Sequence, residues 1–203
     1  HYAERAVYLL NEQMRALHNH SARVRIYDIH STLLFERVVA LPDNSVPVLS
    51  FLQLPEISNL TTTWFLDLRL YDADEQEITT NFYWLSTQED ILDEEAELDD
   101  WDFYTPTKVY ADLTALEKMP KPQLSFESFF QQQGKNRRVK VLIDNPSDHI
   151  AFFVELKVVD QSTGQSVLPV FWNDNYISLL PGESRTVRGR FALEDGQVEV
   201  EVK

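Results

Sequence analysis

Short runs in which apolar and polar residues alternate recur along the chain, and they constrain its fold more than any other feature. In the run from Ala22 to Ile29, for example, Val24 and Ile26 alternate with Arg25 and Tyr27. A period of two places successive side chains on opposite faces of a β-strand, whereas helices repeat every 3.6 residues. We expect Val24 and Ile26 to face a core, and Arg25 and Tyr27 to face water.

The run from Trp64 to Tyr71 alternates in the same way, with Leu66 and Leu68 on one face and Asp67 and Arg69 on the other. It is likewise predicted to be half-buried. Clusters of Pro, Asp, Asn and Ser, which favour turns, separate the runs. The strands expected in the first half are Ala6 to Leu10, Ala22 to Ile29, Leu33 to Leu41, Val46 to Leu54, Trp64 to Tyr71 and Ile78 to Leu85.

The strand pattern resumes at Leu124 and continues to the end of the chain. Seven strands in about 80 residues, without a long helical pattern, are typical of an immunoglobulin-like sandwich. The expected strands are Leu124 to Phe130, Arg138 to Ile143, Ala151 to Val159, Val167 to Trp172, Tyr176 to Leu180, Ser184 to Leu193 and Val198 to Val202. The sequence therefore predicts an all-β fold of two immunoglobulin-like β-sandwich domains in tandem, at residues 1–86 and 123–203.

Residues 87–122 are predicted to be a linker that packs at the domain junction. Nine acidic and no basic residues lie between Glu89 and Asp102, and aromatic residues follow them. Such a block of like charge favours a solvated linker, although carboxylates also suit calcium. The spacing lacks the glycine and the ordered ligand positions of an EF-hand loop. Leu113 and Leu116 could share one helical turn.

The formal net charge of -15 argues against nucleic acid or an anionic membrane surface as a partner, because phosphates would be repelled. No apolar run approaches the ~20 residues of a membrane span, so membrane insertion is not expected. The chain starts at His1 without an initiating Met, and we expect it to be an excised segment of a longer protein.

The sequence offers no residues for a recognised catalytic, metal or cofactor site. It has no cysteine and only five glycines, which leaves little material for thiolate sites or phosphate-binding loops. The zinc motif H-E-x-x-H, the nucleophile elbow, the P-loop and the dinucleotide fingerprint are absent, and His18 and His20 are expected in a loop. We therefore predict no catalytic residues, no metal and no cofactor.

One cluster is unusual, because three large aromatic residues surround three short polar ones. Its members are Phe171, Trp172, Asn173, Asp174, Asn175 and Tyr176. Aromatic faces stack on sugar rings, and Asn and Asp bind hydroxyl groups, so the segment is a candidate carbohydrate or domain contact. In the alternative reading it is a corner between strands, where the polar side chains bind turn amides and the aromatic ones pack inward.

Two stretches resemble a known family. The first runs from Asn81 to Ser86 and continues through Asp100-Trp101-Asp102-Phe103-Tyr104-Thr105-Pro106-Thr107 to Tyr110-Ala111-Asp112-Leu113-Thr114-Ala115-Leu116, and the second runs from Leu168 to Glu183. Both are similar to the last two sandwiches of glycoside hydrolase family 2 exo-β-D-glucosaminidases and related β-mannosidases. In these enzymes a TIM barrel holds the two catalytic glutamates, and none of the barrel motifs occurs in this chain.

The resemblance implies a non-catalytic role for the chain within a glycosidase. Its partners would be the TIM barrel and the N-terminal sandwich domains of the same protein, with the carbohydrate substrate close to the Phe171 to Tyr176 segment. The resemblance also implies a periplasmic or secreted protein. A free carbohydrate-binding module and a protein-binding sandwich remain the alternative functions.

Overall fold

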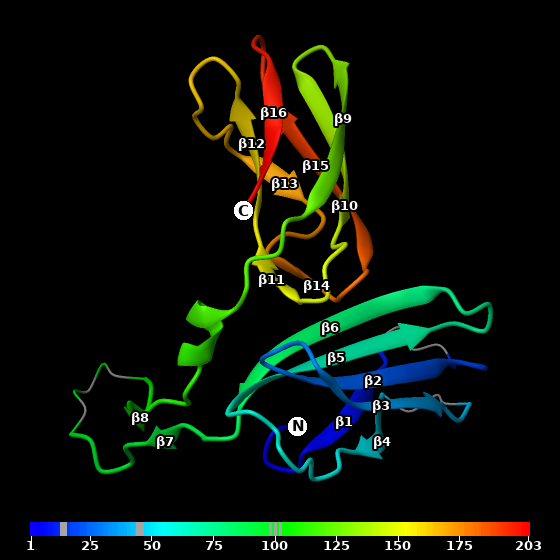
Figure 1. Ribbon diagram of the computed structural model, residues 1–203, viewed down its shortest axis with the longest axis vertical. Helices are drawn as coiled ribbons and strands as arrows, with labels where there is room; N and C mark the ends of the chain where they lie inside the picture. The colour runs from blue at the N-terminus through cyan, green and yellow to red at the C-terminus, as the bar shows by residue number, and fades with distance from the viewer. Residues whose placement is uncertain (13–15, 44–46, 98, 100, 102) are drawn as a thin grey trace. The chain divides into compact units, whose positions relative to one another are not determined.

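A computed structural model describes residues 1–12, 16–43, 47–97, 99, 101 and 103–203 of the protein. Strands form almost all of its regular structure, and the prediction of an all-β fold is confirmed. The chain divides into two compact units, unit 1 from His1 to Met119 and unit 2 from Pro120 to Lys203. Figure 1 shows the strands of each unit.

Unit 1 contains a four-stranded antiparallel sheet in the order β3-β2-β5-β6 and a two-stranded sheet of β1 and β4. The predicted strands lie within two residues of the observed ones, apart from the residue Val46, which lies outside the described part. The elements of unit 1 are β1 (Ala6–Leu10), β2 (Ser21–Asp28), β3 (Leu33–Ala40), β4 (Val48–Gln53), β5 (Thr63–Tyr71), β6 (Glu77–Ser86), β7 (Ile91–Leu92), β8 (Thr107–Val109) and the 3-10 helix η1 (Thr114–Lys118).

The core of unit 1 lies between these two sheets. Val24 and Ile26 are almost fully buried, as the alternation predicts, and Leu66 lies beside them on β5. Val7 and Leu52 cover them from the two-stranded sheet. Each such side chain contributes about 1.5–3 kcal/mol when fully buried, so this layer holds the sandwich together.

The opposite face of β2 and β5 is not the wet face that the alternation predicts. Tyr27 is only 6% exposed and Asp67 only 1%. Arg25 lies directly opposite Asp67 across the two strands and binds its carboxylate, and Phe65 stacks on Phe82. The prediction of a wet face is therefore wrong here, because paired charges and stacked rings let these side chains leave water.

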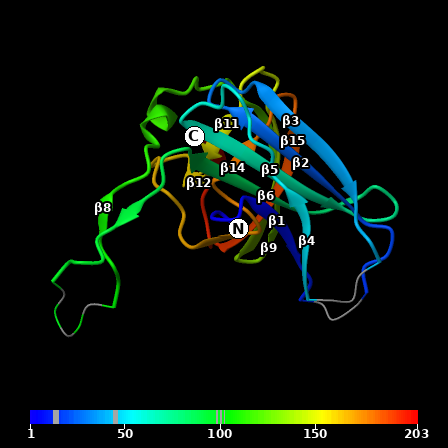
Figure 2. The same ribbon diagram turned by 90° about the horizontal axis from the view of Figure 1, so that it is seen from below.

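The described residues between 87 and 113 form an arm of unit 1, in which the sequence analysis predicted no strand. Strands β7 and β8 pair antiparallel within it, and Figures 1 and 2 both show this short ladder standing away from the four-stranded sheet of its unit. Hydrogen bonds fix its base at the start of β5, from the Thr87 amide to the carbonyl of Thr62, which precedes the strand, and from the Thr63 hydroxyl to the Asp112 carbonyl. The helical turn expected at Leu113 and Leu116 occurs as η1.

Unit 2 contains a four-stranded antiparallel sheet in the order β13-β15-β10-β9 and two shorter pairs, β11-β14 and β12-β16. Val139, Val141, Leu156, Leu179 and Val187 are among its most buried core residues. The elements of unit 2 are β9 (Ser125–Gln133), β10 (Asn136–Asp144), β11 (Ala151–Val154), β12 (Leu156–Asp160), β13 (Val170–Trp172), β14 (Ile177–Leu179), β15 (Ser184–Ala192) and β16 (Val198–Val202).

The single strand predicted from Ala151 to Val159 is wrong, because the structure breaks it at Glu155. Strand β11 pairs with β14, whereas β12 pairs with β16, so the two halves belong to different ladders. The break follows Phe153, whose φ of 57° lies in the left-handed region that aromatic residues rarely adopt. An alternating pattern cannot report such a change of partner, since both halves are apolar.

Candidate functional site

The six residues of the predicted contact segment lie at the corner between β13 and β14, where their side chains take different directions. Trp172 packs on the core of unit 2 and crosses the backbone of β15 at Gly189. A Cβ atom at Gly189 would lie 2.7 Å from the Trp172 ring, so only glycine leaves room for it. Trp172 is therefore an inward-facing residue, as the corner interpretation predicts.

The two asparagines of the segment bind backbone. Asn175 accepts a hydrogen bond from the Leu156 amide at 2.7 Å and donates to the Leu156 carbonyl at 3.1 Å. The side-chain oxygen of Asn173 accepts a hydrogen bond from the Arg188 backbone amide, and the backbone amide of Asn173 donates to the Arg188 carbonyl. These bonds tie the corner to β12 and β15, and they use both polar atoms of the Asn175 side chain but only the oxygen of the Asn173 side chain.

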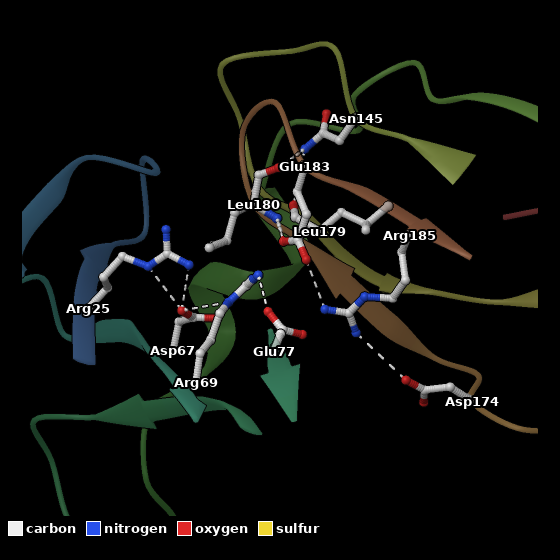
Figure 3. A network of polar contacts seen from close by, with 10 residues as sticks. All are labelled: Arg25, Asp67, Arg69, Glu77, Asn145, Asp174, Leu179, Leu180, Glu183 and Arg185. Carbon is white, nitrogen blue, oxygen red and sulfur yellow. Dashed lines mark hydrogen bonds and ion pairs between the residues drawn. The ribbon is translucent and has the colours of Figure 1, made fainter. Parts of the chain in front are cut away.

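Asp174 belongs to a chain of charges in unit 2, drawn in Figure 3. The Arg185 guanidinium lies 3.6 Å from the Asp174 carboxylate and donates to the Glu183 carboxylate at 2.9 Å. Glu183 in turn accepts from the Leu180 amide at 2.8 Å. Each charge has an opposite partner, so the chain orders the turn between β14 and β15.

Asn145 holds the same end of unit 2 from the inside. Its side chain is buried, and its amide nitrogen donates to the carbonyls of His149, Leu179 and Leu180 at 2.7–3.1 Å. Figure 3 draws Asn145 with Leu179 and Leu180. Its side-chain oxygen accepts from the Ser147 hydroxyl at 2.7 Å. A neutral amide thus satisfies groups that a buried loop would otherwise leave without partners.

Tyr176 and Phe153 form an exposed aromatic pair that the sequence did not predict. Their ring centroids are 5.1 Å apart, both backbones have positive φ, and the side chains are 49% and 46% exposed. The Tyr176 hydroxyl donates to Glu155 at 2.7 Å, which lowers the pKa of that carboxyl, with Lys157 adding to the effect. No sequence pattern connects Phe153 and Glu155 with Tyr176, because they lie about 20 residues before it in the chain.

Phe171 is the most exposed aromatic residue of the segment, at 59%. The Arg190 guanidinium lies 5.5 Å from its ring centroid, within cation–π range. The corner interpretation is thus correct for Asn173, Asn175 and Trp172. It also predicted that Phe171 and Tyr176 pack inward, and this is wrong because both rings are exposed. A contact role for the segment stays a prediction.

The arm of unit 1 exposes several large apolar side chains. Trp101 is 84% and Phe103 is 91% exposed, and Tyr104, Tyr110 and Ile91 exceed half. Single exposed apolar residues are ordinary, but several on one short segment mark a contact surface.

Among the residues that the structure describes, no group of three or more His, Asp or Glu side chains could hold a metal ion. Of the acidic run considered for calcium, Leu98, Asp100 and Asp102 lie outside the described residues. His18 pairs with Asp43 at 2.9 Å, and this hydrogen bond lowers the pKa of the Asp43 carboxyl. No described helix is long and apolar enough to cross a membrane.

Comparison with known proteins finds exo-β-D-glucosaminidases among the relatives of this chain. The model of the exo-β-D-glucosaminidase Ig-fold domain matches residues 102–203. An exo-β-D-glucosaminidase from Arthroderma benhamiae is 34% identical over 99% of this chain and 22% of its own length, and one from Amycolatopsis orientalis is 32% identical over 94% and 19%. The crystal structure of Amycolatopsis orientalis exo-chitosanase CsxA superposes with a TM-score of 0.87 at 28% identity, over 98% of this chain and 24% of that one.

This chain spans about a fifth of the length of these curated relatives. The family model covers half of the chain, and the relatives align with nearly all of it. The resemblance inferred from the sequence is thereby confirmed, and the chain belongs to the exo-β-D-glucosaminidase Ig-fold domain family.

Proposed function

We propose that this chain is a non-catalytic part of a larger exo-β-D-glucosaminidase, in which it packs on and supports the remaining domains. The observation that carries the proposal is the one-sided alignment, which uses 99% of this chain but only 22% of a relative. The catalytic TIM barrel and the N-terminal sandwiches would belong to the remainder. The activity of the whole protein, and its export to the periplasm or beyond, are parts of the same proposal.

The exposed arm is the surface best suited to such packing. Trp101, Phe103 and Tyr110 are each at least 74% exposed, although the base of the arm is hydrogen-bonded to β5. Large aromatic side chains gain the most when they are buried at an interface, and a held base reduces the entropy lost on docking. We propose that the remainder of the protein covers these rings.

The corner of unit 2 supplies a second contact in this proposal. Of the six residues of the segment, only Phe171 and Tyr176 present exposed rings, since Trp172 packs inward and the side-chain oxygens of the asparagines bind backbone. Contact with the rim of the substrate pocket would therefore use rings rather than amide groups.

Substitution of the arm tests the proposal in the full-length enzyme. The triple variant Trp101→Ser, Phe103→Ser, Tyr110→Ser should lower the temperature at which activity on p-nitrophenyl β-D-glucosaminide is lost, because the barrel loses buried contacts. The KM should change little, since the arm binds domains and not substrate. Heat inactivation followed by residual-activity assays measures the first effect, and initial rates over a range of substrate concentrations measure the KM.

Tyr2 is 70% exposed outside the arm, and Tyr2→Ser serves as the matched control. An arm variant that inactivates at the wild-type temperature would contradict the proposal. The isolated chain should release no p-nitrophenol, and turnover by it would contradict a non-catalytic role.

A carbohydrate-binding module is the second candidate, and the exposed pair of Phe153 and Tyr176 rings favours it. Calorimetry of the isolated chain with glucosamine oligomers separates the two functions. Measurable binding that Tyr176→Ala abolishes would favour the module.

A further inference from the structure

Charge is distributed very unevenly between the two units. Unit 2 contains 10 Lys and Arg against 11 Asp and Glu, whereas unit 1 contains 8 against 22. Almost the whole negative charge of the chain therefore belongs to unit 1, and unit 2 is nearly neutral. Within this neutral unit, positive charge is concentrated on one face of one sheet.

Four exposed bases occupy adjacent positions on the outer face of β10 and β15. Arg138 lies opposite Arg190 in the register, and Lys140 lies opposite Arg188. The intervening Val139 and Gly189 are buried, so all four bases share the face away from the core. Directly opposite residues have Cβ atoms about 4.5–5.5 Å apart, and alternate residues on a strand are about 6.6 Å apart.

None of these four bases is within ion-pair distance of a carboxylate in the described part of the chain. Glu127 on β9 is a carboxylate on a neighbouring strand, but it lies opposite Leu142 on β10 and not opposite one of the bases. Like charges placed directly opposite each other destabilise a sheet. The fold thus tolerates an unfavourable arrangement that a negative partner would relieve.

Two phenylalanine rings flank the bases. Phe129 on β9 lies opposite Lys140 and is 49% exposed, and Phe171 on β13 lies opposite Arg190 and is 59% exposed. An open groove on this face is lined by both rings, the four bases and Gln131. Exposed Arg beside aromatic residues is the composition of protein interfaces, where both types are enriched.

We propose that this basic face, defined as Arg138, Lys140, Arg188 and Arg190 with Phe129 and Phe171, docks a carboxylate-rich surface of a polypeptide. The proposal rests on the proposed function only for the supplier of that surface, which is the remainder of the longer protein. Three of the four bases are arginines, whose planar guanidinium groups match carboxylates in two-pronged hydrogen bonds.

Carbohydrate fits this face less well than an acidic polypeptide. A glucosamine polymer carries ammonium groups, which the four bases repel. The Arg190 guanidinium already covers the Phe171 ring, on which a sugar would have to stack. A long polyanion would also meet the net charge of -15 on the whole chain, whereas a compact acidic patch meets chiefly the local positive field.

Three short probes of equal charge number test the proposal on the full chain by calorimetry at low salt. The first is a capped peptide with four Glu alternating with Ser, whose carboxylates repeat at the strand spacing of the bases. The second is tetragalacturonate, with four carboxylates on a glycan, and the third is the tetramer of glucosamine. The peptide should bind most tightly, and rising salt should weaken it because these charges are exposed.

The variant Arg138→Gln, Lys140→Gln, Arg188→Gln, Arg190→Gln should lower peptide affinity about tenfold or more, as expected for several exposed ion pairs lost together. The control variant Arg37→Gln, Lys108→Gln, Lys118→Gln, Lys121→Gln changes net charge equally at exposed sites elsewhere and should keep wild-type affinity. Circular dichroism should show both variants folded.

Several outcomes would overturn the proposal. They are absence of peptide binding, an equal loss in the control variant, and tighter binding of tetragalacturonate, which would assign the face to an anionic glycan. Self-association of the chain in sedimentation that only the basic-face variant abolishes would assign it to a second copy. Arm substitutions leave these measurements unaffected, so this proposal and the proposed function can fail separately.

Discussion

The four-stranded sheets of the two units handle charge on their outer faces in opposite ways. In unit 1, Asp67 binds Arg25 at 2.8 Å and Arg69 at 3.2 Å, and Arg69 reaches Glu77 at 3.0 Å (Figure 3). Two positive and two negative charges thus balance each other. In unit 2, the corresponding bases on β10 and β15 face one another without a carboxylate between them.

This difference shows what each face is built to do. The balanced face of unit 1 lets Asp67 become almost fully buried, because two guanidinium groups replace the water that it loses. The basic face of unit 2 stays exposed, and the repulsion between its like charges lowers the stability of the fold. An arrangement that folding does not require is better explained by binding.

The largest effect is expected from breaking the balanced face. Asp67→Asn leaves the guanidinium groups of Arg25 and Arg69, whose side chains are only 15% and 11% exposed, without their shared counter-charge, and should lower the free energy of unfolding by about 3–5 kcal/mol. Urea denaturation followed by circular dichroism measures it. Asp74→Asn, at an exposed turn, should change stability by less than about 0.5 kcal/mol. Equal effects of the two substitutions would mean that the buried pairing contributes nothing.

The next largest effect concerns the neutral amide that orders unit 2. Asn145→Ala removes the donor from three carbonyls, and should cost about 2–3 kcal/mol because buried acceptors are left unsatisfied. Asn136→Ala, at an exposed position of β10, is the matched control. A urea midpoint that stays at the wild-type value for Asn145→Ala would refute this assignment.

A smaller effect of opposite sign is expected on the basic face. Arg138→Gln removes one of two like charges that lie opposite each other, and should raise the free energy of unfolding by about 0.2–1 kcal/mol. The gain should shrink in high salt, which screens exposed charges. Arg37→Gln on unit 1 should bring no such gain. A loss of stability at Arg138 would show that the face is not strained by repulsion.

The smallest effect concerns the exposed pair of Tyr176 and Glu155. The Tyr176 hydroxyl lowers the pKa of Glu155 below the usual 4.5, so its stabilisation is present above that pH and is lost as pH falls through the lowered pKa. Tyr176→Phe should therefore lower the melting temperature slightly at pH 7 and hardly at all at pH 3. A pH-independent difference between Tyr176→Phe and wild type would argue that ring packing, not the hydrogen bond, is responsible.

The alternation of apolar and polar residues predicted the environment of some residues and not of others. The period of two located β2 and β5 and identified Val24 and Ile26 as core residues, because burial of apolar surface acts on each strand locally. The same period placed Asp67 in water, since it says nothing of what lies opposite a charge. Phe153 and Tyr176 come together across about 20 residues, and no local pattern reports that contact.

The sequence by itself determined the all-β class, most strand positions and, through the Leu168 to Glu183 stretch, the family to which the chain belongs. These properties follow from local periodicity and from motif order. Only the tertiary structure decided that Arg25 meets Asp67, whereas Arg138 meets Arg190. Strand register sets which charges become neighbours, and the electrostatic energy of a pair depends on that neighbourhood and on burial, neither of which is written in a single strand.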